Sequence, residues 1–168
     1  YGISKLASEK IIEEFHLKYD LNYTILRYGS VYSERSFHNN YLFNLVKSAL
    51  DNKKIVHNSD GNELREYIHC SDVAKLSVDV IEEKSFLNKC FILTGIEQNS
   101  RKQIFEMIKE ISGENIEIEL NEDGDSNHYK LSPYSFQPSM SKKLIANPQI
   151  DLGQGILEII KKIKQNGA

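Results

Sequence analysis

The chain has 168 residues, of which 40% are hydrophobic and 27% charged, and its formal net charge is −3. These proportions are typical of a folded globular protein and exclude an intrinsically disordered chain. No run of apolar residues approaches the ~18 that a membrane-spanning helix needs, and no basic excess indicates a nucleic-acid partner. The length predicts one domain, or one domain and part of another.

The first half of the chain alternates helical and strand patterns. Apolar residues recur three and four positions apart from Ile3 to Phe15, which predicts a helix. No capping residue precedes this helix, so we expect the chain to be the C-terminal part of a longer protein. The next predicted elements are a strand at 23–27, an irregular loop at 29–40, a helix at 41–50, a strand at 54–57, a turn at 59–62, a strand at 64–69 and a helix at 73–81 capped by Ser71 or Asp72.

The second half continues the alternation. Ser100 is predicted to cap a helix that extends to Ile111 and ends at Gly113. The other predicted elements are a strand at 90–93, a strand at 116–120, a polar loop at 121–135, a short helical turn at 139–144 and an amphipathic helix at 155–164. Strands that alternate with helices in this way predict an α/β fold.

One pair of residues on the first predicted helix is suited to proton transfer. Tyr1 and Lys5 are four residues apart, so their side chains share a face. An ammonium group beside a phenol lowers the phenol pKa from about 10 and lets the tyrosine exchange a proton with a hydroxyl or carbonyl group. The five histidines show no metal-ligand spacing, and Cys70 and Cys90 form no C-x-x-C motif, so we predict no metal site.

Five short segments carry further information together. They are 1–5 (Tyr-Gly-Ile-Ser-Lys), 26–32 (Leu-Arg-Tyr-Gly-Ser-Val-Tyr), 65–74 (Arg-Glu-Tyr-Ile-His-Cys-Ser-Asp-Val-Ala, after Asp60-Gly61), 91–95 (Phe-Ile-Leu-Thr-Gly) and 141–144 (Ser-Lys-Lys-Leu, followed by Gly155-Ile156). In this order and at this spacing, they resemble the motifs of the extended short-chain dehydrogenase/reductases. That family contains the NAD-dependent nucleotide-sugar epimerases and dehydratases, and the resemblance begins at its Tyr-x-x-x-Lys motif.

The resemblance implies an α/β fold in two parts. One is the end of a Rossmann-type parallel sheet, and the other is a smaller, mixed α/β substrate-binding domain. Residues 1–39, with contributions from about 64–95, would be the C-terminal remnant of the NAD-binding domain, and residues 40–168 mostly the substrate-binding domain. The Gly-rich turn of a dinucleotide site is missing, because Gly153-Gln-Gly155 follows no predicted strand.

The resemblance also implies roles for individual residues. Tyr1 would be the catalytic acid/base, and Lys5 would bind the nicotinamide ribose. The other implied contacts are Tyr28 along the cofactor, Ser30, Asn40, Tyr41 and His57 around the substrate nucleotide and sugar, and Arg65 at the substrate pyrophosphate. Ser30 stands where the family has Asn, Ser33-Glu34 where it has Gly-Pro, and the late element at 122–125 lacks the Arg of the family's Arg-x-Gly-Asp.

These observations predict the C-terminal portion of a cytoplasmic, NAD-dependent nucleotide-sugar epimerase or dehydratase that interconverts sugars by transient hydride transfer. The portion alone is expected to be inactive, and the family suggests a homodimer with no nucleic-acid or membrane partner. The identity of the sugar, the choice between epimerase, dehydratase and reductase, and NAD against NADP stay open. The alternative is a non-catalytic relative that uses the fold as a nucleotide-sugar binding or interaction module.

Overall fold

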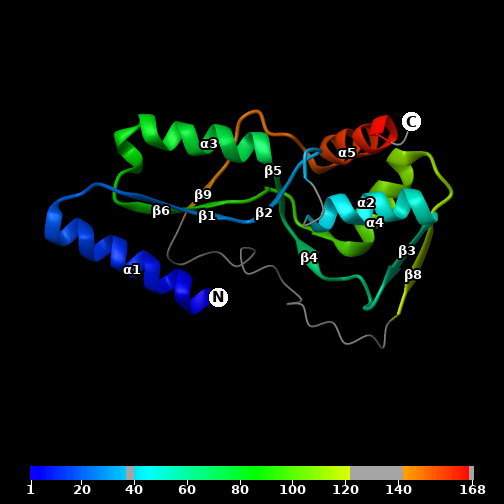
Figure 1. Cartoon of the computed structure of the whole chain (residues 1–168), viewed down its shortest axis with the longest axis horizontal. Helices are drawn as coiled ribbons and strands as arrows, with labels where there is room; N and C mark the ends of the chain where they lie inside the picture. Colours follow the sequence, from blue (N-terminus) through cyan, green and yellow to red (C-terminus); the bar gives the residue numbers. More distant parts are fainter. Residues whose placement is uncertain (37–39, 122–141, 167–168) are drawn as a thin grey trace.

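The computed structural model describes residues 1–36, 40–121 and 142–166. The elements form two lobes that lie side by side along the long axis of the molecule (Figure 1). Each lobe has a hydrophobic cluster of its own. In the described part of the chain, no helix is both long and apolar enough to cross a membrane.

The N-terminal lobe is built on a parallel sheet. Its strands are β1 (Thr24–Tyr28), β6 (Lys89–Leu93) and β9 (Lys142–Leu144), in the order β1-β6-β9. Helix α1 (Gly2–Tyr19) lies on one side of the sheet and α3 (Cys70–Glu82) on the other, and a 3-10 turn, η1 (Lys84–Phe86), precedes β6 (Figure 1). The buried cluster of this lobe lies on the α3 side and contains Ile68, Leu76, Phe91, Leu93 and Ala146.

The C-terminal lobe packs three helices around a second cluster. They are α2 (Tyr41–Asn52), α4 (Arg101–Ser112) and α5 (Leu152–Asn166), which lie beside the parallel pair β3 (Lys54–His57) and β8 (Glu117–Leu120). The fully buried residues here are mainly aliphatic and include Leu42, Val46, Ile104, Phe105, Ile108, Ile156 and Ile159. This is the larger of the two clusters, so most of the apolar burial that stabilises the chain lies in this lobe.

Two short strand pairs join the lobes. Strands β2 (Ser30–Tyr32) and β5 (Tyr67–His69) are parallel, whereas β4 (Leu64–Arg65) and β7 (Asn99–Ser100) are antiparallel. Tyr32 of β2 belongs to the C-terminal cluster, and Ile68 of its partner strand belongs to the N-terminal cluster. The β2–β5 pair therefore couples the two cores across a few backbone hydrogen bonds.

Helix α1 attaches differently from the other long helices. None of its 18 residues is buried against the described part of the chain, and Leu6, Ile11 and Phe15 are all more than half exposed. Its main polar link to the sheet is a two-pronged ion pair, in which Arg27 of β1 donates through Nε and Nη2 to the two carboxylate oxygens of Glu9 at 2.8 and 2.5 Å. The apolar side chains of α1 are thus left largely uncovered by the described residues.

Most predicted elements are confirmed, but four details are wrong. Ser30–Tyr32 is a strand rather than part of an irregular loop, because it pairs with β5. The strand predicted at 64–69 is interrupted at Glu66, which is buried and bound by Lys143 and Gln98.

The other two errors concern a cap and the last strand. His69, not Ser71 or Asp72, is the N-cap of α3, and its ring accepts a hydrogen bond from the Ser71 amide. Residues 142–144 form β9 rather than a helical turn, because they pair with β6. The rest of that predicted turn, and the predicted loop beyond Asn121 up to residue 135, lie outside the described residues. Helix α4 has the predicted Ser100 cap, as a full capping box, and the predicted end at Gly113, which has a φ of 67°.

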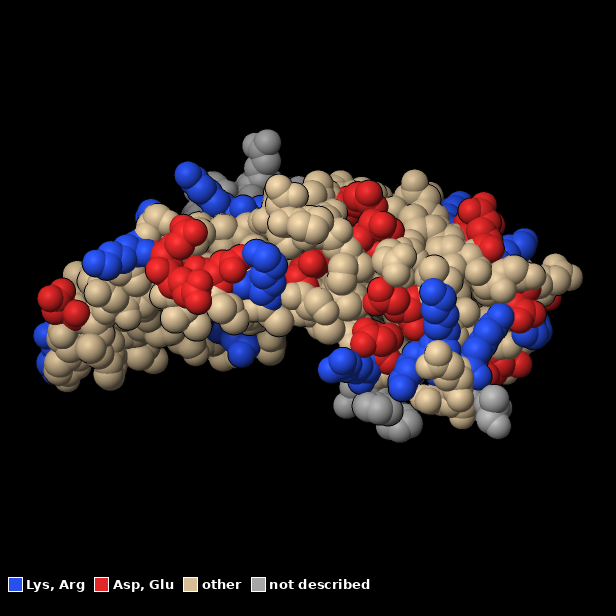
Figure 2. Space-filling model, turned by 90° about the horizontal axis from the view of Figure 1, so that it is seen from above, with Lys and Arg blue, Asp and Glu red and all other residues tan. Residues whose placement is uncertain are grey.

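Charges of both signs are interspersed over the face of the molecule that carries α3 and α5 (Figure 2). Several are paired along a helix, as in Lys47–Asp51 and Lys75–Asp79. This face therefore presents no extended basic field of the kind that binds a nucleic-acid backbone.

Candidate functional site

The predicted acid/base pair lies at the free end of α1. Tyr1 is 96% exposed, and the Lys5 ammonium lies 5.3 Å from the centre of its ring. Glu9 contacts Arg27 near the carboxyl end of β1, so the turns of α1 before Glu9 extend beyond that end of the strand. Ligands of open parallel α/β sheets bind at the carboxyl ends of the strands. The pair is therefore accessible at the edge where chemistry is expected, and α1 directs it toward the C-terminal lobe (Figure 1).

Two arginines lie next to each other between the lobes. Arg65 ends β4, and Arg101 begins α4, directly after β7, the antiparallel partner of β4. Burial and the neighbouring positive charge of Arg101 lower the pKa of the Arg65 guanidinium. Because an arginine remains protonated at neutral pH, the effect shows that two like charges are held close together in partly desolvated surroundings.

Arg101 is held in place by two aromatic rings. Its guanidinium carbon lies 4.1 Å from the centre of the Tyr41 ring, and Nη1 donates a 2.8 Å hydrogen bond to the hydroxyl of Tyr67. Arg101 is only 7% exposed. Among the described residues, no carboxylate forms an ion pair with it. A buried charge is normally paired, so this arrangement is suited to a ligand that brings its own negative charge.

The nearby acidic groups are engaged elsewhere. The Glu63 carboxylate accepts hydrogen bonds from Ser59 and faces the His57 ring, with Nε2 3.3 Å from both carboxylate oxygens. Burial alone would raise the pKa of Glu63, but these bonds and its own backbone hydrogen bond hold it below its ordinary value. His57 also meets Phe105 edge to face at 5.2 Å. The structure therefore places His57 in a polar cluster of the C-terminal lobe, and its predicted contact with a nucleotide base stays a prediction.

Three other predicted residues also have structural partners. Asn40 is the N-cap of α2, and its side chain accepts from the Phe43 amide and donates to the Val31 carbonyl. Ser30 is half-buried at the start of β2, opposite Tyr67. The Tyr28 hydroxyl lies 3.0 Å from Ser77 Oγ on α3, on the opposite face of the sheet from the Arg27–Glu9 link to α1. These contacts orient the side chains and leave the predicted ligand roles as predictions.

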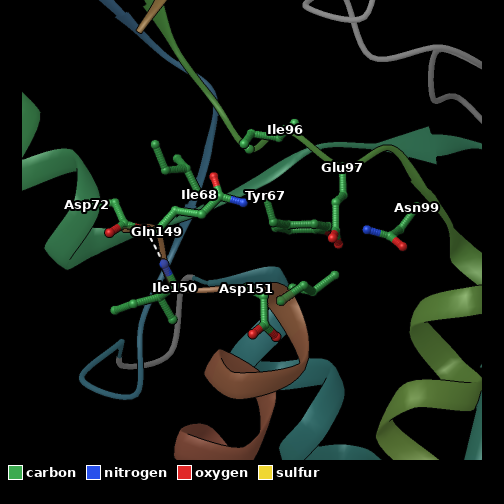
Figure 3. A pocket seen from close by; sticks show the side chains of 11 residues that line it. Tyr67, Ile68, Asp72, Ile96, Glu97, Asn99, Gln149, Ile150 and Asp151 are labelled. Carbon is green, nitrogen blue, oxygen red and sulfur yellow. Dashed lines mark hydrogen bonds between the residues drawn. The ribbon is translucent and has the colours of Figure 1, made fainter. Parts of the chain in front are cut away.

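A small pocket lies beside Tyr67, the tyrosine that binds Arg101. It is formed between the segment linking β6 to β7 and the segment that leads into α5 (Figure 3). The Asp72 carboxylate at its wall accepts a 2.9 Å hydrogen bond from the Ile150 amide. Three acids, Asp72, Glu97 and Asp151, line the pocket without any Lys or Arg. It is therefore unsuited to a phosphate and is distinct from the arginine pair, although Tyr67 borders both.

From the sequence we single out Arg65 and Tyr41, but not Arg101 and Tyr67, which lie beside them in the structure. One sequence pattern indicates that Arg101 is buried. It occupies the first position of a helix and lies on the same inward face as the apolar residues Ile104, Phe105 and Ile108. An arginine at the buried edge of such a helix needs an anionic partner or a polar cradle.

The fold is that of a Rossmann-type α/β protein with an appended helical lobe. Residues 1–92, more than half of the chain, match the model of the family described as "NAD dependent epimerase/dehydratase family". This chain belongs to that family, which confirms the resemblance drawn from the motifs.

Individual relatives are consistent with this membership. The chain is 27% identical over 169 residues to a putative UDP-glucose 4-epimerase of Methanocaldococcus jannaschii, covering 99% of this chain and 53% of that protein. Two crystal structures share the fold. A UDP-glucuronic acid 4-epimerase from Bacillus cereus, in complex with UDP-glucuronic acid and NAD, is 23% identical with a TM-score of 0.78, and the match covers 99% of this chain and 52% of that one. A UDP-glucose 4-epimerase from Thermotoga maritima with UDP-glucose is 22% identical with a TM-score of 0.80, and the match covers 100% of this chain and 54% of that one. The chain thus spans about half the length of these relatives.

Proposed function

We propose that this chain is the C-terminal, substrate-binding part of an NAD-dependent nucleotide-sugar epimerase. Family membership supports the reaction class, and the relatives that act on or bind UDP-sugars support the substrate class. The observation that carries the proposal in this chain is Arg101, a buried arginine beside Arg65 with no carboxylate paired to it among the described residues. Two guanidinium groups match the two phosphates of a nucleoside diphosphate.

Arg101 would supply the second positive charge for the diphosphate, in place of an arginine that this sequence lacks. The element at 122–125 lacks the arginine that the family places there. Arg101 brings a second positive charge to Arg65 from a different element, the start of α4. Tyr41 and Tyr67 fix its guanidinium, so little side-chain entropy is lost when a diphosphate binds.

Tyr1 and Lys5 would carry the proton-transfer step. NAD, when bound, supplies the capacity to accept a hydride from a sugar carbon and return it. Tyr1 would take the proton from the sugar hydroxyl and give it back, and Lys5 would bind the nicotinamide ribose and favour the phenolate. The exposure of Tyr1 and the position of Lys5 over its ring are compatible with these roles.

The proposal also covers the domain organisation of the protein and the activity of this chain by itself. We infer that residues 1–39, with part of 64–95, belong to an NAD-binding domain completed by a preceding Rossmann half, and that without this half the chain neither binds NAD tightly nor turns over substrate. The exposed apolar side chains of α1 are compatible with such a covering partner or with a homodimer. The two half-buried cysteines, Cys70 and Cys90, are free thiols, which is consistent with a cytoplasmic protein.

The substrate part of the proposal is tested by calorimetric titration of the chain with UDP. Arg101→Leu and Arg65→Leu should each weaken binding by ~1.5–3 kcal/mol, or about 10- to 150-fold, since each removes a charge-assisted hydrogen-bond donor. Arg35→Leu is the matched control, because the Arg35 side chain is 86% exposed and should not contribute. Equal UDP affinity in all three variants would show that the arginine pair does not bind the diphosphate.

The catalytic part is tested in the protein that carries the Rossmann half. Tyr1→Phe retains the ring and should lower kcat by ~10²–10⁴ while NAD affinity stays nearly unchanged. Lys5→Met should weaken NAD binding as well. Unchanged turnover in Tyr1→Phe, with UDP-sugar binding intact, would favour the alternative in which the fold serves as a non-catalytic binding module.

A further inference from the structure

Three side chains from distant parts of the sequence converge where α5 packs against the β2–β5 pair. His69 ends β5, Glu34 follows β2, and Glu158 lies in α5. One donor atom from each, the Nε2 of His69 and a carboxylate oxygen of each glutamate, lies within 4.8 Å of the other two. This group is separate from Tyr1, from the arginine pair and from the acidic pocket.

Close packing of α5 produces the convergence. A Cβ atom at Gly155 would lie 2.2 Å from the hydroxyl oxygen of Tyr32, so only glycine allows α5 to approach β2 this closely. Glu158 follows Gly155 by three residues and therefore lies on the same side of the helix. The Tyr32 ring packs edge to face on His69, with 5.3 Å between ring centres, and holds the imidazole between the two carboxylates.

The atoms that point into the centre of this group have no hydrogen-bond partner. His69 is 2% exposed, and among the described residues neither its Nε2 nor the buried Oε2 of Glu34 makes a hydrogen bond. The Nε2 atom lies 3.5 Å from Glu34 Oε2 and 3.6 Å from Glu158 Oε2. These separations are at or beyond the upper limit of a hydrogen bond, and they are close to the ~3.3–3.5 Å that separates two ligands of a tetrahedral ion with bonds of about 2.0–2.1 Å.

The remaining carboxylate oxygens are oriented by other groups. Glu158 Oε1 accepts a 2.9 Å hydrogen bond from Gln154 Nε2, and Glu34 Oε1 accepts a 3.2 Å bond from Arg35 Nε. Burial would raise the pKa of Glu34, yet its backbone hydrogen bond and the nearby His69 and Arg35 keep it below its ordinary value. Each glutamate thus presents one oxygen to the centre while the other is held, as in the outer shell of metal sites.

We propose that Glu34, His69 and Glu158 bind a divalent transition-metal ion of the Zn²⁺ class, with an open fourth position. One imidazole and two carboxylates suit Zn²⁺ and its neighbours, whereas Mg²⁺ and Ca²⁺ prefer oxygen ligands throughout. Glu34 lies in the Ser33-Glu34 pair where the resembling family has Gly-Pro, so the site depends on a departure of this sequence. The wide separation of the three ligands explains why sequence spacing predicts no metal site.

The hydrogen bond that His69 accepts reports on metal binding. The Ser71 amide donates to Nδ1 at 3.3 Å, so in the absence of metal the ring proton lies on Nε2, between the carboxylates. Metal binding at Nε2 displaces this proton to Nδ1 at the expense of the Ser71 hydrogen bond, or into solvent. The Ser71 amide resonance should therefore shift when metal binds.

The proposal is tested by calorimetric titration of the EDTA-treated 168-residue chain with ZnCl₂. We expect one saturable site, at least 10-fold weaker affinity in Glu34→Gln and in Glu158→Gln, and unchanged affinity in Glu106→Gln, which replaces an exposed acid of α4. Melting in EDTA establishes that each variant folds. If Glu158→Gln does not fold, Glu34→Gln carries the test, because Glu34 lies in a turn outside the helices.

Co²⁺ in place of Zn²⁺ reports the ligands directly. A tetrahedral visible spectrum without a thiolate charge-transfer band supports the proposed set, whereas a thiolate band would assign the ion to Cys70 or Cys90 and overturn it. The proposal also fails if no saturable heat is seen, or if the glutamine variants bind Zn²⁺ as tightly as the parent. In those cases the three side chains bind no metal ion.

Discussion

Helices α1 and α5 both carry apolar residues at helical spacing, but those of α5 are concentrated on one face whereas those of α1 are spread around the helix, and the two helices have opposite fates in the structure. Five residues of α5 are buried, including Ile156 and Ile159, whereas none of the residues of α1 is buried against the described part of the chain. The difference lies in what surrounds each helix. Two other helices close around α5, whereas the described sheet beside α1 offers three strands. Apolar residues at helical spacing therefore predict that a helix forms, but not whether the same chain covers its apolar side chains.

The largest expected effect comes from truncating one isoleucine in each helix. Ile156→Ala should lower the free energy of unfolding by ~2–5 kcal/mol, because it opens a cavity in the C-terminal core. Ile11→Ala should change it by less than ~0.5 kcal/mol, because Ile11 is 58% exposed. Urea denaturation of both variants measures the two values. Similar losses, measured at a protein concentration too low for self-association, would mean that the chain itself buries Ile11.

A pair of glycines sharpens the same contrast. Gly155→Ala should destabilise the chain by ~1–3 kcal/mol, since the new methyl group overlaps the Tyr32 ring and forces α5 outward. Gly2→Ala meets nothing within 4 Å and should be neutral or slightly stabilising in a helix. Thermal melting compares the variants, and a neutral Gly155→Ala would show that α5 can shift without cost.

The exposed apolar side chains of α1 should also determine whether two copies of the chain associate. We expect the chain to self-associate in sedimentation equilibrium, and Ile11→Lys to weaken that association at least 10-fold, or by about 1.4 kcal/mol. Val78→Lys on α3 is the control, because Val78 is 54% exposed and lies on the other side of the sheet. A parent chain that remains monomeric at high concentration would show that α1 needs no second copy.

The smallest expected effect concerns the ion pair that attaches α1. The hydrogen bond from Arg27 lowers the pKa of Glu9 below its usual 4.5. A carboxyl whose folded pKa is depressed stabilises the fold above its unfolded pKa and loses that contribution as pH falls through the folded value. Amide-exchange protection of α1 should therefore drop by about 1 kcal/mol below pH 4.5. Glu9→Gln should remove this dependence, and an unchanged acid response in that variant would assign it to another group.

Sequence reasoning reached the fold class because helix and strand periodicities are local, and because the motifs follow one another in family order. It identified the Ser100 cap and the Gly113 stop from single residues. It missed β9, since only pairing with β6 makes residues 142–144 a strand. It also missed Arg101 and the His69 cluster, because the residues that meet there are 34 to 124 positions apart in the sequence. Local patterns predict elements, whereas the sites depend on contacts that only the folded chain creates.

Strand β9 has a consequence for how such a protein can change over evolution. The three strands of the N-terminal sheet are residues 24–28, 89–93 and 142–144. The elements of the C-terminal lobe lie between these strands in the sequence and after the last strand. Neither lobe is a continuous stretch of sequence. A new C-terminal lobe could not be acquired by a single recombination event, because several junctions would have to be matched at once. The C-terminal lobe can therefore change more readily through point substitutions and loop insertions than through exchange of a module.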